Sequence, residues 1–248
     1  MGMKVFSMTD TGIRRTMNQD YYFASDSAVG NLPNLYIVAD GMGGHKAGDY
    51  ASRYTVECVV ASALKNTTDY PVKILREAIE KANKVLLLES KTNEDKRGMG
   101  TTIVAATIID GKMLVANVGD SRLYIINRTI RQITKDHSYV AELVRRGQMD
   151  PRDARTHAGR NMITKAVGTD WTVEPDFFEV ELRENDKILL CSDGLTNMVT
   201  DETIHRIISE WKEPKKVVKK LIDEANSNGG SDNITAVMID PYADEVIE

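Results

Sequence analysis

The sequence predicts an α+β fold in which helices pack outside stacked antiparallel β-sheets, and three observations support this. Apolar runs rich in β-branched residues, which are typical of strands, outnumber the helical patterns. Several of these runs are joined by turns too short for the crossover connection that parallel strands require. The helical patterns are amphipathic and fall in blocks between the strands, so each of them needs a sheet face to cover.

The expected strands are short apolar segments bounded by turn residues. They lie near 35–39, 101–109, 112–118, 122–127, 187–191 and 234–239. Asp110-Gly111 separates two of them and predicts a hairpin, because Asp and Gly tolerate the left-handed backbone of a two-residue turn.

The expected helices carry apolar residues at spacings of three and four. They lie near 46–65, 71–90, 136–147, 201–211 and 214–226. The stretch 147–168 is long, charged and without apolar periodicity, which in a compact domain is typical of a functional loop. No linker divides the chain, so we expect one domain over 1–240, followed by a short acidic tail at 241–248.

Composition limits the classes of partner. A chain of 248 residues, 42% of them hydrophobic, can bury a substantial core, and a net charge of −5 gives no reason to expect nucleic acid. No apolar run approaches the roughly 20 residues that span a bilayer, and the first residues lack a signal-peptide pattern. We therefore expect a cytoplasmic protein, a monomer without membrane contact, in which Cys58 and Cys191 are buried thiols.

Three aspartates share an unusual local context at the ends of expected strands. Asp40 follows 35–39 and precedes a glycine-rich turn, Asp193 follows 187–191, and Asp232 stands just before 234–239. A single Asp-Gly pair is usually only a turn. Three buried acids at strand ends, however, would repel one another unless cations lay between them, and oxygen ligands are those that Mg²⁺ and Mn²⁺ prefer. The sequence therefore predicts one metal centre with more than one ion.

The glycines after Asp40 do not form a nucleotide-binding loop. A dinucleotide fingerprint that began at Gly41 would need glycine where Lys46 stands, and the chain has no Gly-Lys-Ser or Gly-Lys-Thr sequence. Small residues here let a backbone carbonyl, such as that of Gly41, approach a cation closely.

Six motifs together resemble those of the metal-dependent type 2C (PPM-type) serine/threonine protein phosphatases, in their order and approximate spacing. They are Arg15 to Asp20, Asp40 to His45, Gly100 to Thr102, Val118 to Arg122, Cys191 to Leu195 and Gly229 to Thr235. The chain looks like the compact bacterial branch of that family. The resemblance implies an α-β-β-α sandwich that hydrolyses phosphoserine and phosphothreonine in proteins by a metal-activated water. It also implies two Mn²⁺ or Mg²⁺ ions with room for a third, and a Ser/Thr kinase and its targets as partners.

The resemblance also assigns metal ligands. Asp40 would bridge the two ions, the carbonyl of Gly41 would bind one of them, and Asp193 and Asp232 would complete the set. Asp20 would act directly or through water. Asp120, together with Asp193, matches the position of a weaker third ion, although an acid before Ser121 and Arg122 can also be a simple turn residue.

Two arginines are candidates for substrate contact. Arg15 matches the phosphate-binding arginine of the family, because the spacing Arg-x-x-Asn selects it over Arg14, and its planar fork suits a phosphoryl group. With Asp40 and Asp193 it forms the expected catalytic set. Arg160, in the stretch that corresponds to the family's flap at 147–168, either contacts the phosphopeptide or is a solvated charge.

The chain departs from the family pattern at two positions. Gln19 replaces a common glutamate, which predicts weaker binding of one ion, and Met42 stands where the eukaryotic branch has a histidine. His45 either protonates the leaving oxygen or has no role, and His137, His157 and His205 receive none. Two other functions remain open: an inactive module that binds a signalling partner, and a hydrolase of small phosphomonoesters.

Overall fold

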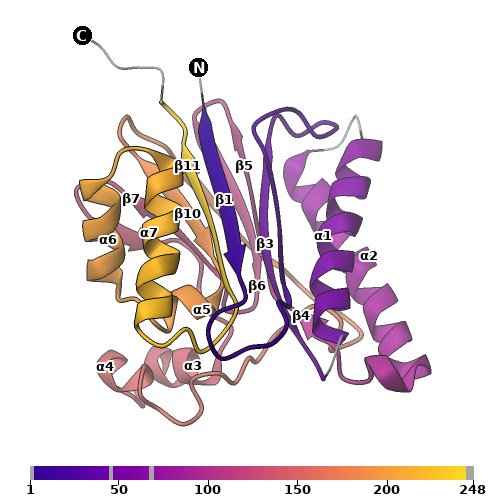
Figure 1. Ribbon diagram of the computed structural model, residues 1–248. Coiled ribbons are helices and arrows are strands. Elements are labelled where there is room, and N and C mark those ends of the chain that lie inside the picture. Colours follow the sequence, from indigo (N-terminus) through magenta and orange to yellow (C-terminus); the bar gives the residue numbers. More distant parts are fainter. Residues whose placement is uncertain (1–2, 45–46, 67–69, 244–248) are drawn as a thin grey trace.

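The protein is described here by a computed structural model that covers residues 3–44, 47–66 and 70–243. Two antiparallel sheets stack against each other, and pairs of helices cover their outer faces (Figure 1). This arrangement confirms the predicted fold class. His45 and the acidic residues at 244–248, for which the sequence raised expectations, lie outside the described ranges.

The first sheet combines the first and last strands of the chain with three strands from later in its middle part. Its strands are, in spatial order, β1 (Lys4–Asp10), β11 (Ile234–Asp240), β10 (Lys187–Cys191), β7 (Arg122–Ile126) and β8 (Ile130–Gln132). The second sheet has the order β2 (Asp20–Ser25), β3 (Leu35–Met42), β5 (Ile103–Ile109), β6 (Lys112–Val118) and β9 (Asp176–Glu181). A two-residue strand, β4 (Gly100–Thr101), pairs with the end of β3.

Four strands, and the division of one expected strand into two, were not predicted. No strand was expected at β1, β2, β8 or β9, and the expected strand at 101–109 is divided into β4 and β5. The hairpin between β5 and β6 is confirmed. Asp110 and Gly111 have φ values of 50° and 74°, which is the left-handed backbone that this turn requires.

The long helices lie on opposite outer faces. Helices α1 (Ala47–Lys65) and α2 (Pro71–Thr92) cover the second sheet, while α6 (Asp201–Glu210) and α7 (Pro214–Ser227) cover the first (Figure 1). Among the described residues, none of the helices is long and apolar enough to cross a membrane.

Short helices mark the end of the molecule where the expected acids lie. They are η1 (Glu94–Lys96), α3 (Tyr139–Arg145), α4 (Pro151–Ala154) and α5 (Asp193–Thr196). The helix expected at 136–147 is shorter than predicted, because the side chain of Ser138 accepts the backbone N–H of Ala141 at 3.3 Å and caps the helix there.

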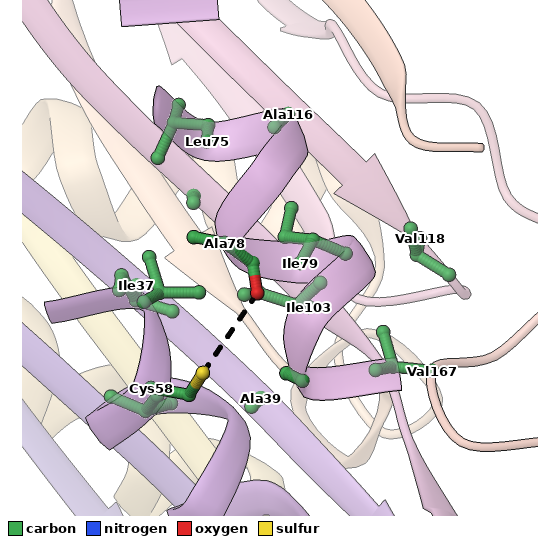
Figure 2. Close-up of a cluster of buried hydrophobic side chains, with 14 of the residues drawn as sticks. Ile37, Ala39, Cys58, Leu75, Ala78, Ile79, Ile103, Ala116, Val118 and Val167 are labelled. Carbon is green, nitrogen blue, oxygen red and sulfur yellow. Dashed lines mark hydrogen bonds between the residues drawn. The ribbon is translucent and has the colours of Figure 1, made fainter. Parts of the chain in front are cut away.

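Three apolar layers hold the sandwich together. Successive side chains of a strand point to opposite faces of its sheet, so one strand contributes to two layers. In β10, Ile188 and Leu190 face the other sheet, whereas Leu189 and Cys191 face α6 and α7. Figure 2 shows part of the layer beneath α1 and α2, where Cys58 Sγ lies 3.9 Å from the carbonyl oxygen of Ala78. Both cysteines are free and buried, as predicted.

Candidate metal centre and active site

Five aspartates gather at one end of the sandwich: Asp20, Asp40, Asp120, Asp193 and Asp232. Asp20 begins β2 directly opposite Asp40 on β3, and the other three stand at the ends of β10 and at the starts of β7 and β11. Asp40 keeps some solvent exposure, but the protein around it removes enough water to raise its pKa far above the ordinary range. The charges of the other four acids raise this pKa further, so all five lie within electrostatic reach of one another.

The backbone of Asp40 is held by the Gly100–Thr102 segment. Its N–H donates to Thr102 Oγ1 at 2.9 Å, and its carbonyl accepts both the Thr101 hydroxyl and the Thr102 N–H at 2.9 Å. These contacts give the threonines a definite role, which is to fix the end of β3 where the acid must point into the cluster.

Gly41 sits where no side chain fits. Its N–H donates to the carbonyl of Gln19 at 3.0 Å, and a Cβ would lie 2.0 Å from the carbonyl oxygen of Gly48. The first turn of α1 therefore packs directly on the end of β3. The glycine is required by this packing, in addition to the carbonyl role that the sequence suggested.

Asp20 is buried with only one of its two carboxylate oxygens satisfied. Oδ2 accepts hydrogen bonds from Ser192 Oγ and Thr235 Oγ1, both at 2.7 Å, while Oδ1 is buried and has no partner among the described residues. Burial raises the pKa of Asp20 to about 7, and the charges of Asp193 and Asp232 contribute to this rise.

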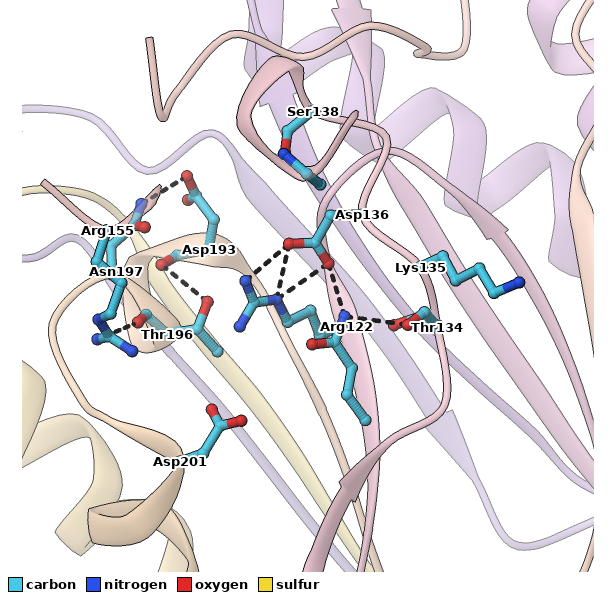
Figure 3. Close-up of polar contacts among 12 residues, drawn as sticks. Arg122, Thr134, Lys135, Asp136, Ser138, Arg155, Asp193, Thr196, Asn197 and Asp201 are labelled. Atoms are coloured by element: carbon cyan, nitrogen blue, oxygen red, sulfur yellow. Dashed lines mark hydrogen bonds and ion pairs between the residues drawn. The ribbon is translucent and has the colours of Figure 1, made fainter. Parts of the chain in front are cut away.

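Asp193 and Asp120 repeat this pattern. Asn197 Nδ2 donates to Asp193 Oδ2 at 2.9 Å (Figure 3), but Asp193 Oδ1 and Asp120 Oδ1 are buried without a hydrogen-bond partner in the described part of the chain. Burial raises the pKa of both carboxyls above the ordinary range, and each is also close to another acid. Three unsatisfied carboxylate oxygens on neighbouring strand ends form a set of ligands suited to a hard cation.

The acids do not close around a single point. Within the described residues, no three Asp, Glu, His or Cys side chains converge tightly enough to enclose an ion by themselves. Cations such as Mg²⁺ keep several water ligands in proteins and take only one or two protein carboxylates.

Arg15 lies at the edge of the cluster. Its Nη2 donates to Asp232 Oδ2 at 2.8 Å and its Nε to the carbonyl of Ser231 at 3.4 Å, while about half of the side chain (49%) stays exposed. The structure therefore brings this guanidinium beside the acids and leaves it open to a ligand from solvent.

Asn233 holds the loop that carries Arg15. Its Nδ2 donates to the carbonyls of Thr11 and Met17 at 2.9 Å, and its Oδ1 accepts the N–H of Gln19 at 2.8 Å. The amide therefore ties the backbone of the 11–19 loop to the start of β11.

A partly buried ion pair lies close to Asp120 in the chain, and sequence reasoning missed it. Arg122 donates to Asp136 through Nε at 3.0 Å and Nη2 at 2.7 Å (Figure 3). Its Nη1 donates to the Tyr124 hydroxyl at 2.9 Å. The available signal was Arg122, two residues after Asp120, because a buried arginine requires an acid.

His137 also has neighbours that the sequence did not reveal. Its Nδ1 accepts the N–H of Gly119 at 3.0 Å, and its Nε2 lies 3.2 Å from Asp176 Oδ2. Burial lowers the pKa of this histidine, which keeps the imidazole in the form that accepts from Gly119. His137 thereby fixes the turn that precedes Asp120.

The stretch 147–168 meets the cluster at a small cavity of about 70 Å³. Asp120 lines it from just before β7 and Asp193 from the start of α5, while Arg155 and Arg160 line it from this stretch. Arg155 Nη2 donates to the carbonyl of Thr196 at 2.9 Å, which attaches the stretch to α5 (Figure 3). Arg160 lines the same cavity as Asp120 and Asp193.

Comparison with known proteins identifies the family to which these stacked sheets and clustered acids belong. The sequence profile of the family described as Protein phosphatase 2C matches residues 13–228, and the chain belongs to this family. It is 41% identical over 240 residues to the serine/threonine phosphatase stp of Listeria welshimeri, covering 94% of this chain and 93% of that protein.

Solved structures show the same fold. The serine/threonine phosphatase Stp1 from Staphylococcus aureus superposes with a TM-score of 0.90 at 38% identity, covering 96% of this chain and 95% of that one. The catalytic domain of the serine/threonine phosphatase PstP, in complex with two manganese ions, gives a TM-score of 0.84 at 31% identity, covering 96% and 97%. This protein is accordingly a serine/threonine protein phosphatase.

Proposed function

We propose that this phosphatase hydrolyses phosphoserine and phosphothreonine in proteins with the help of two Mn²⁺ or Mg²⁺ ions held by the aspartate cluster. The observation that carries the proposal is the set of buried, unpartnered carboxylate oxygens on Asp20, Asp120 and Asp193. Isolated buried charges of this kind are strongly unfavourable unless a cation compensates them. The PstP catalytic domain, a relative with this fold, was crystallised with two manganese ions.

The ligand set follows from the strand ends. Asp40 lies among the other acids and is the candidate for bridging two ions, with Gly41, Asp193 and Asp232 as further ligands and Asp20 as a ligand directly or through water. Asp120 and Asp193 both line the small cavity, which favours a third ion at that side. When bound, such ions supply Lewis acidity that activates a water molecule at neutral pH and neutralises phosphoryl charge.

The substrate phosphate is assigned to Arg15. Its guanidinium already donates to one anion, the carboxylate of Asp232, and its exposed half can donate to a second. A planar fork donates two parallel hydrogen bonds to a phosphoryl group and orients it for attack in line with the leaving oxygen. Arg160 is the second candidate for substrate contact, because it reaches the acid cluster from the flap at 147–168.

The partners follow from the reaction. A phosphatase of this specificity opposes a Ser/Thr kinase, so we infer that such a kinase and its targets supply the substrates. We propose that a single domain over 1–240, acting as a monomer, carries out the reaction.

The decisive experiment compares substrates and metals. With Mn²⁺, the protein should hydrolyse a phosphothreonine peptide much faster than a sugar phosphate, and EDTA should abolish both activities. A preference for the sugar phosphate would favour a hydrolase of small phosphomonoesters. Binding of a phosphoprotein without turnover would favour an inactive module. Anomalous scattering from a crystal soaked in Mn²⁺ would count the ions and identify their ligands.

A further inference from the structure

Some of the exposed apolar side chains belong to segments that border the aspartate cluster. Ten large hydrophobic side chains are exposed among the described residues, and four of them belong to the two segments that border the aspartate cluster. These four are Ile13, Met17, Tyr139 and Met162. Single exposed apolar residues are ordinary, but a group around a polar site indicates an interaction surface.

The first half of this group flanks Arg15 on the 11–19 loop. The N–H of Ile13 donates to the carbonyl of Gly230 at 2.9 Å, and Arg15 Nε donates to the next carbonyl, that of Ser231. Ile13 and Arg15 thus rest on the same short segment beside Asp232. Ile13 is 64% exposed and Met17 is also exposed, so apolar surface lies on both sides of the proposed phosphate-binding residue.

The second half lies on the flap side of the cluster. Ser138 and Val140 line the cavity that contains Asp120 and Asp193, and Tyr139 stands between them in the chain. The Tyr139 N–H donates to the carbonyl of Met162 at 2.8 Å, and both side chains lie around Gly159. Met162 is 59% exposed. In Figure 1 the loop after β1 and the region of α3 and α4 are both at the lower end of the sandwich.

From this arrangement we infer that Ile13 and Met17 on one side, and Tyr139 and Met162 on the other, form an apolar rim that selects phosphoprotein segments with apolar residues on both sides of the phosphorylated residue. The inference rests on the proposed function, since the rim matters only if a phosphoprotein enters the site. Its partner is an unfolded or extended segment, because such a segment can present side chains to both halves while its phosphate reaches Arg15. An acidic segment is the alternative that the nearby arginines would favour.

The rim is tested with phosphothreonine peptides of equal length in the Mn²⁺-loaded protein. One peptide carries leucine and valine around the phosphothreonine, one carries glycine and one carries aspartate. The wild-type protein should prefer the apolar peptide to the glycine peptide by about tenfold in kcat/KM, which is the effect of burying one or two methylene groups. Peptides with apolar residues on only one side of the phosphothreonine show which side each half of the rim contacts.

Substitutions then show which side chains cause the preference for the apolar peptide. Ile13→Ser and Met162→Ser should each reduce the ratio of kcat/KM for the apolar and glycine peptides several-fold, and the double variant should bring it close to one. Leu64→Ser is the matched control, because Leu64 is 56% exposed on α1, away from the two segments that border the acids, and this variant should keep the wild-type ratio.

Three results would overturn the inference. They are equal rates for the apolar and glycine peptides, a preference for the aspartate peptide, and a loss of preference in Leu64→Ser as large as in Ile13→Ser. Failure of every peptide to be hydrolysed with Mn²⁺ is a distinct result, because it would refute the proposed function on which the rim depends.

Discussion

The same kind of dipeptide, Asp-Gly, lies near each of the two ends of strand β5, in opposite environments. At its far end Asp110-Gly111 makes an exposed hairpin turn with both residues in the left-handed region. At its start β5 lies beside the end of β3, where Asp40-Gly41 is packed against α1 and surrounded by four other acids. A local pattern of two residues thus means a turn at one end and a candidate cation site at the other, and the neighbours from distant strands make the difference.

The largest expected effect is a loss of activity when Asp193, in the acid cluster, is replaced, compared with no loss when Asp110, in the hairpin turn, is replaced. Asp193→Asn should reduce kcat on a phosphothreonine peptide by at least about 10²-fold, because it removes charge where the cations are proposed to bind. Asp110→Asn is the control and should keep full activity, since asparagine tolerates the left-handed turn. Thermal unfolding of both variants checks that each is folded. Full activity in Asp193→Asn would refute the assigned centre.

The glycines at the acid end give the next effect. Gly41→Ala should destabilise the protein by about 3 kcal/mol, because the new Cβ would meet the carbonyl of Gly48. Gly44→Ala, only three residues away, meets nothing within 4 Å and should change the free energy of unfolding by less than about 0.5 kcal/mol. Denaturant unfolding measures both values. Equal stabilities would contradict the close packing of α1 on β3.

Metal ions should stabilise the acid end specifically. Mn²⁺ at about 100 times its Kd should raise the free energy of unfolding by about 2.7 kcal/mol per site, and EDTA should reverse this. The gain should be reduced in Asp193→Asn and retained in Asp110→Asn. An unchanged melting temperature on addition of millimolar Mn²⁺ would argue against the centre.

A further effect concerns the pH dependence of the metal-free protein. The pKa of Asp20 is 3.8 in its ordinary state and about 7 when folded, so the folded state binds its proton more tightly. The contribution of Asp20 to stability is therefore fully present below about pH 4 and is lost as the pH rises through 7. Urea unfolding in EDTA between pH 5 and pH 8 should show this decline, and Asp20→Asn should make it shallower. A decline of the same slope in Asp20→Asn would show that other groups cause it.

The sequence predicted the central strands well and missed the edges. The four unpredicted strands β1, β2, β8 and β9 are the four edge strands of the two sheets, and Asp20 is the only buried residue in any of them. An edge strand has less apolar surface to bury, so its sequence lacks the continuous apolar run that identifies β11 or β5. For β2 the aromatic run Tyr21 to Phe23 was a usable signal.

The sequence by itself determined the chemistry available to this protein: the acids at the strand ends, the glycines between them and the family to which these motifs belong. These features are local, because each depends on a few consecutive residues. Only the tertiary structure decided which oxygens are left unpartnered, that Thr235 and Ser192 hold Asp20, that Arg122 requires Asp136 and that apolar residues from two distant segments border the site. Such contacts join residues far apart in the chain, and their geometry arises from the packing of the two sheets.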